Sequence, residues 1–91
     1  MNLAEIQQHA SALSGLGEDS GVWRAVQAAF AECRKDAVAA VKDFKATGEE
    51  RAYHAGCLFA LDEVLEQLED LRSGAWKQWP SVKGEAEQND E

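Results

Sequence analysis

The side chains that most often carry catalysis or bind metals are few in this chain of 91 residues, which has two cysteines and two histidines. Cys33 and Cys57 form no CxxC pair, and His9 and His54 form no HxxxH or ExxH pattern. The sequence therefore predicts no catalytic residue, no metal site and no cofactor. We expect both cysteines to be free thiols that fill space in a helical core, as unpaired cysteines commonly do.

Carboxylates are plentiful in one segment, residues 61–71, which holds five acidic and five apolar residues and no basic one. Acid–base catalysis needs carboxylates in a dry, concave site, whereas an amphipathic helix places these on its solvated side. Two readings remain: a face that keeps the protein in solution, or a docking surface for a basic partner. The acidic residues of this candidate surface are Asp62, Glu63, Glu66, Glu69 and Asp70.

Three aromatic residues extend the candidate surface. At helical spacing, Phe59 lies on the same side as Glu63 and Glu66, and a ring surrounded by charge is typical of an interface anchor. The alternative is that the first helix folds over the ring. Trp76 and Trp79 are spaced three residues apart beyond a glycine stop. Because exposed indoles are costly, they either fold back onto the open end of the pair of long helices or insert into a groove of a partner.

The elements that position these residues are helices. Asn2 and Glu5 predict a capping box for a short first helix, and Asp19 or Ser20 is expected to cap a second helix that runs to Ala46. A third helix is expected from the Thr47–Glu50 capping box to about Arg72, followed by a stop at Gly74. Each long helix carries a seam, a row of apolar residues at alternating spacings of three and four that is expected to face the other helix. The first seam consists of Trp23, Val26, Phe30, Cys33, Ala37, Ala40 and Phe44, and the second of Cys57, Leu61, Val64, Leu68 and Leu71.

Two long helices joined by so short a turn must run antiparallel. The sequence thus predicts an all-α fold, an antiparallel helical hairpin of two long helices with a short N-terminal helix and a Trp-containing C-terminal tail. Residues 1–74 are expected to form a single helical domain, and 75–91 a C-terminal extension with an acidic tail. A set of small residues is expected to let the two backbones approach closely: Ala37, Ala40, Ala52, Gly56 and Ala60.

The charge balance restricts the possible partners. Nine basic against seventeen acidic residues give a net charge of −8, which repels nucleic-acid phosphates and anionic membrane surfaces. No apolar run approaches the roughly 20 residues that span a bilayer, and no basic start indicates a secretory signal. We therefore expect a protein partner, with no direct nucleic-acid or membrane binding, and a location inside a cell or in a particle that is assembled there. The basic second helix and acidic third helix also allow pairing between copies in a homo-oligomer.

The segment RAYHAGCLFALDEVL at 51–65, with the preceding helix that opens VWRAV at 22–26, resembles small helical-hairpin proteins encoded in tailed-bacteriophage genomes. The resemblance spans roughly residues 20–72 and brings no functional residues with it. It implies a virion or assembly role. The expected function is that of a non-enzymatic interaction protein, a minor phage structural or assembly component. The alternative is a small acidic inhibitor that imitates nucleic-acid charge and blocks a basic site on a host protein.

Overall fold

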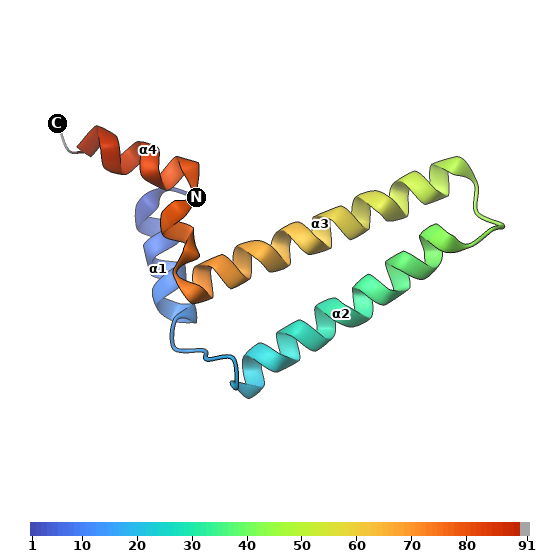
Figure 1. Ribbon diagram of the computed structural model, residues 1–91, viewed down its shortest axis with the longest axis horizontal. Helices are drawn as coiled ribbons and strands as arrows, with labels where there is room; N and C mark the ends of the chain where they lie inside the picture. The colour runs from blue at the N-terminus through green and yellow to red at the C-terminus, as the bar shows by residue number, and fades with distance from the viewer. Residues whose placement is uncertain (90–91) are drawn as a thin grey trace. The chain divides into compact units, whose positions relative to one another are not determined.

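The computed structural model describes residues 1–89 and confirms the all-α class, since these residues form helices and no strand. Figure 1 shows the order of the elements along the chain. Four α-helices and one short 3-10 helix follow one another as α1 (Leu3–Leu13), α2 (Gly21–Lys42), α3 (Gly48–Ser73), η1 (Ala75–Gln78) and α4 (Pro80–Asn89).

The chain divides into two compact units, and the division falls inside α3. The first, here called the terminal unit, contains Met1–Gly17 and the chain from Gln67 onward. The second, here called the hairpin unit, contains Glu18–Glu66. The expected boundary after residue 74 differs from this division, because the last turn of α3 belongs with the N-terminal helix and the C-terminal segment.

The helix caps expected from the sequence are present. The backbone N–H of Glu5 donates to Asn2 Oδ1 at 2.8 Å, and that of Trp23 donates to the hydroxyl of Ser20 at 3.4 Å. At the start of α3, the N–H of Glu50 donates to Thr47 Oγ1 at 3.1 Å, and the N–H of Thr47 donates back to Glu50 Oε2 at 3.2 Å. These bonds satisfy donors that a helix start leaves without partners.

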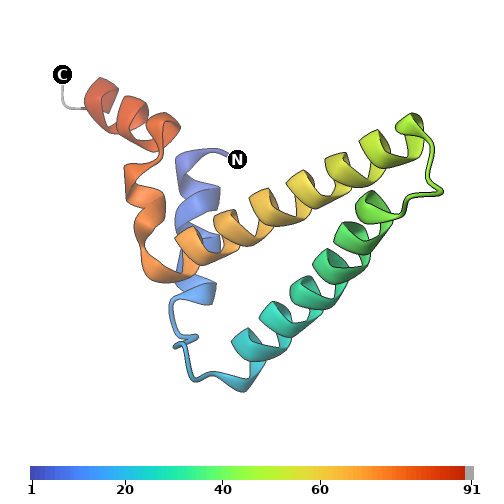
Figure 2. The ribbon, with the colours of Figure 1, turned by 45° about the vertical axis from the view of Figure 1, so that its right-hand side comes forward.

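The hairpin unit contains α2 and the first part of α3, which run antiparallel side by side in Figures 1 and 2. The expected end of α2 at Ala46 is wrong, because the helix ends at Lys42. The carboxylate of Asp43 accepts a hydrogen bond from the backbone N–H of Lys45 at 2.9 Å and so stabilises a turn instead of a further helical turn. Phe44 thereby leaves the seam and is 84% exposed.

The seam of α3 is also rotated relative to the prediction. Val64, an expected seam residue, is 48% exposed, whereas Leu58 and Leu65 are half-buried. The expectation that both cysteines fill a core is wrong for Cys33, which is exposed, and Cys57 is half-buried; both are free thiols. In the hairpin unit, only Trp23 and Ala37 are buried. The hairpin therefore leaves much of its apolar surface uncovered.

The two backbones do not approach each other as the small residues suggested. A Cβ atom built at Gly56 would meet no atom within 4 Å, so no neighbouring backbone requires a glycine there. Gly56→Ala should therefore raise the free energy of unfolding by about 0.5–1 kcal/mol, the usual gain for this change within a helix. Urea unfolding of the variant and the wild-type chain measures the difference. A loss of stability would show that α2 packs closely against this position.

The terminal unit has a small core of its own. Ile6 and Ala10 from α1, Leu71 from the last turn of α3 and Val82 from α4 are buried together. Gly74 makes the turn after α3 with a φ of 92°, a conformation that favours glycine, and donates its N–H to the carbonyl of Asp70 at 3.1 Å. Within the expected C-terminal extension, the residues from Pro80 to Asn89 form the helix α4.

Candidate functional site: the acidic patch of α3

The strongest candidate site is the outward side of α3 in the hairpin unit. Phe59 is 69% exposed. Glu63 and Glu66 follow at spacings of four and seven residues, are also exposed, and make no hydrogen bond or ion pair with the side chains that the structure describes, those of residues 1–84. Residues at these spacings share one side of a helix. We call Phe59, Glu63 and Glu66 the acidic patch.

Asp62 lies at the edge of this patch and connects the two helices. Its carboxylate accepts a hydrogen bond from Arg34 Nε of α2 at 3.1 Å, and both side chains are about half exposed. An exposed ion pair of this kind contributes at most about 1 kcal/mol, because water and salt screen it. Asp62 is therefore partly neutralised within the hairpin unit, and it offers less to a partner than Glu63 and Glu66 do.

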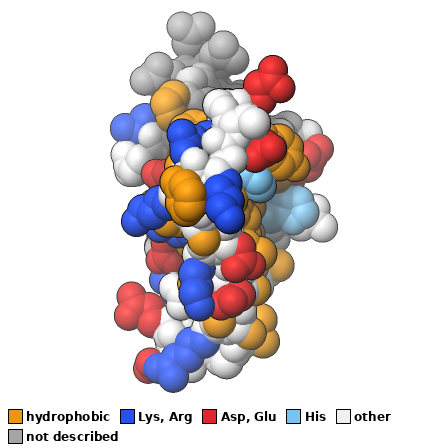
Figure 3. Space-filling view, turned by 90° about the vertical axis from the view of Figure 1, so that its right-hand side faces the viewer, with side chains coloured by type: hydrophobic (Ala, Val, Ile, Leu, Met, Phe, Trp, Pro, Cys, Tyr) orange, Lys and Arg blue, Asp and Glu red, His pale blue; other side chains and the backbone are white. Residues whose placement is uncertain are grey.

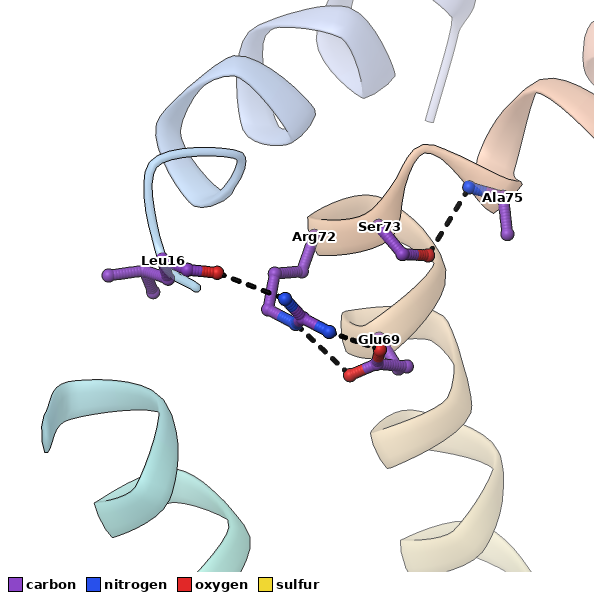
Figure 4. Close-up of polar contacts among 5 residues, drawn as sticks. All are labelled: Leu16, Glu69, Arg72, Ser73 and Ala75. Carbon is purple, nitrogen blue, oxygen red and sulfur yellow. Dashed lines mark hydrogen bonds and ion pairs between the residues drawn. The ribbon is translucent and has the colours of Figure 1, made fainter. Parts of the chain in front are cut away.

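Glu69 and Asp70, the other two expected acidic residues, belong to the terminal unit and are engaged there. Figure 4 shows Arg72 between the carboxylate of Glu69 and the backbone carbonyl of Leu16. The guanidinium donates two hydrogen bonds to Glu69 and one to Leu16, the latter at 3.1 Å. Such a charge-assisted arrangement links the last turn of α3 to the segment after α1. The acidic residues of α3 thus have two different roles.

The tryptophans take the first of the two arrangements left open by the sequence. Trp76 and Trp79 are half-buried and pack against the cluster of Ile6, Ala10, Leu71 and Val82. The indole Nε1 of Trp79 donates to Asp70 Oδ2 at 2.6 Å, which satisfies the one polar atom of the ring. The structure therefore joins these side chains to the core of the terminal unit.

A hollow of about 470 Å³ lies in the terminal unit, between α1 and the chain from Leu71 to Lys77. Three of its polar side chains, Ser14, Arg72 and Ser73, already serve the fold. The hydroxyl of Ser14 donates to the carbonyl of Ser11 at 3.1 Å, that of Ser73 accepts from the N–H of Ala75 at 3.4 Å, and Arg72 is held as described above. A small-molecule site needs several polar groups that converge on the ligand. This hollow offers fewer free polar groups to a ligand than its lining suggests.

Neither the comparisons with known proteins nor the remaining candidate residues assign a function to the chain. Searches with protein-family models, against curated proteins and against solved structures found no match to the chain. Within the described part of the chain, no group of three or more His, Cys, Asp or Glu side chains is placed to hold a metal ion. None of the helices formed by these residues is both long and apolar enough to cross a bilayer.

One surface was not anticipated from the sequence. Ala29, Phe30, Cys33 and Leu61 line a hollow of about 120 Å³ on one face of the hairpin unit. The signal for it was a second apolar stripe beside each seam, at Val22, Ala29 and Cys33 on α2 and at Cys57, Ala60 and Val64 on α3. The heptad pattern had assigned Cys33, Cys57 and Val64 to contacts between α2 and α3, so these residues were not considered as part of an exposed surface.

Proposed function

We propose that this chain is a non-enzymatic protein-interaction protein that binds a basic surface of a partner through the acidic patch. One observation supports the proposal: the ring of Phe59 is 69% exposed beside two carboxylates, Glu63 and Glu66, that form no ion pair with the described side chains of residues 1–84. Exposed aromatic rings are frequent anchors of protein interfaces, and carboxylates around them favour Lys and Arg on the partner.

The patch suits docking better than catalysis. It lies on the solvated side of one helix, where water surrounds its carboxylates, and its residues line neither of the two hollows described above. Charge at such a surface accelerates encounter with an oppositely charged partner and selects among partners.

The partner class that we propose is a phage-type assembly, in which the chain is a minor structural or assembly component. The support is the resemblance of residues 20–72 to helical-hairpin proteins of tailed bacteriophages, together with the net charge of −8. Under this proposal the protein is found in the virion or, before assembly, in the host cytoplasm.

The test is the protein content of particles purified from the native host. A structural component is present at a fixed number of copies per particle, and Phe59→Ala reduces that number. Tyr53→Ala is the matched control, because Tyr53 is equally exposed at 68% on the same helix but lies away from the patch. If the chain is absent from the particles and displaces nucleic acid from a host nuclease or polymerase, it is an inhibitor and the assembly role is wrong.

A further inference from the structure

We infer that the turn between α2 and α3 is a second docking surface, at which Phe44 enters an apolar pocket of a partner protein whose rim carries carboxylates. The turn comprises residues 43–47 and lies within the hairpin unit. This inference goes beyond the proposed function, which concerns the acidic patch on the side of α3, and it does not depend on that function.

Phe44 is the anchor of this surface. Its 84% exposure exceeds that of every other large apolar side chain that the structure describes. A single exposed apolar side chain is common and by itself indicates no interface. Here, however, the seam spacing from Ala37 and Ala40 to Phe44 would keep the ring on the seam if α2 continued, and the helix instead ends at Lys42. A departure from the local pattern that exposes a large ring is expected where the ring has a function.

Hydrogen bonds fix the turn that carries the ring. The backbone carbonyl of Asp43 accepts from the N–H of Ala46 at 3.1 Å and from Arg51 Nη2 of α3 at 3.0 Å. Its carboxylate accepts from the N–H of Lys45, and the capping box described above holds the start of α3. An anchor on a backbone that is already ordered loses little conformational freedom when it binds. The turn therefore presents Phe44 in a pre-organised position.

The charge beside the ring is basic. Nζ of Lys45 lies 5.7 Å from the centroid of the Phe44 ring, and the exposed Lys42 ends α2 two residues before it. Figure 3 faces the end of the hairpin unit that holds the turn, and it shows a hydrophobic side chain with Lys or Arg side chains on both sides. A ring among ammonium groups fits an apolar pocket with carboxylates at its rim.

The acidic residues near the turn serve its structure. The carboxylates of Asp43 and Glu50 accept backbone N–H groups, those of Lys45 and Thr47. Glu49 lies in the first turn of α3, where a carboxylate stabilises the free N–H groups of a helix start. These three carboxylates therefore act on the backbone, whereas the amine of Lys45 lies at the ring.

A second copy of this chain does not offer the required pocket. The acidic patch supplies carboxylates, but its residues line neither of the two hollows described above. The charged residues that line the hollow of about 470 Å³ are Arg72 and Lys77, both basic, and no charged residue lines that of about 120 Å³. Because neither hollow combines an enclosed space with carboxylates, we assign the turn to a different protein.

A benzophenone amino acid at position 44 of the full chain, in the cells that produce it naturally, tests the inference. We expect one product with another protein, and mass spectrometry should place the link in a segment of that protein that contains Asp or Glu. Lys42→Glu with Lys45→Glu should abolish the product. Arg24→Glu with Lys35→Glu is the matched control, because it adds the same negative charge at exposed positions of α2 away from the turn and should keep the product.

The ring has its own measurement, with the crosslinking amino acid moved to the exposed position of Glu49. Phe44→Ala should then abolish the product, whereas Val22→Ala, a change at the other end of α2 where Val22 is 62% exposed, should keep it. Helical circular dichroism should be retained in every variant, since all the changed side chains are exposed. A product that survives the reversal at Lys42 and Lys45, equal loss in a variant and its control, a product of two copies of this chain, or no product at position 44 would overturn the inference.

Discussion

Leu71→Ala is expected to lower the free energy of unfolding by about 2–5 kcal/mol, the range for removal of a buried leucine side chain. Leu71 is 6% exposed and lies in the small core of the terminal unit with Ile6, Ala10 and Val82. Because so few residues form this core, the cavity left by the change removes a large part of the apolar contact. Urea unfolding followed by far-ultraviolet circular dichroism measures the loss.

Val64→Ala is the matched control for this change, because Val64 lies on the same helix but is 48% exposed. Its effect should stay below about 1 kcal/mol, in keeping with a position that is only partly removed from water. The control is measured at a concentration where the chain is monomeric, so that lost association does not add to the result. Equal losses for the two variants would contradict the burial pattern described above.

The second large effect is expected for Trp79→Ala, which should cost about 2–4 kcal/mol, somewhat less than removal of a fully buried indole. The ring of Trp79 packs against the core of the terminal unit, and its Nε1 donates to Asp70. The change removes both the packing and the hydrogen bond, and it leaves the half-buried carboxylate of Asp70 without this donor. Thermal unfolding of the isolated chain gives the result.

Trp79→Phe separates the two contributions, since it keeps most of the ring and loses only the donor. We expect it to cost about 1.5–3 kcal/mol, the range for a hydrogen bond to a charged group. If Trp79→Ala left the stability unchanged, the indole would not be part of the core. Loss of partner binding in that same variant would then assign the residue to an interface.

The sequence predicted the elements whose causes are local. Capping boxes at Asn2 and Thr47 and the glycine stop at Gly74 depend on residues three or four positions apart, and all three are present. The antiparallel hairpin followed from the short turn between two long helices. The end of α2 was missed because the Asp43 carboxylate accepts a hydrogen bond from Lys45, a local alternative to helix that the apolar spacing of Phe44 concealed.

Features that depend on contacts between residues far apart in the sequence were harder to predict. The heptad spacing showed that α3 has an apolar side, but it did not determine how the helix is rotated about its axis. In the structure Val64 is 48% exposed and Leu65 is half-buried. Small side chains such as Ala60 and Gly56 suggested close packing, although the same residues equally suit an open surface. In the candidate site, exposure of Phe59 followed from helical spacing, whereas the engagement of Glu69 and Asp70 required contacts with Arg72 and Trp79.

The central claim, that the acidic patch is the docking surface, is tested most directly by a photo-crosslinking amino acid placed at position 59 or at position 53. Tyr53 and Phe59 are exposed to the same degree on one helix, so reagent access does not distinguish them. In cells that assemble the native particles, position 59 should crosslink to one defined basic protein, and added Glu63→Lys with Glu66→Lys should abolish that product. Position 53 should not give that product. Crosslinking of the same partner from both positions, or a product from position 59 that survives the charge reversal, would contradict the account.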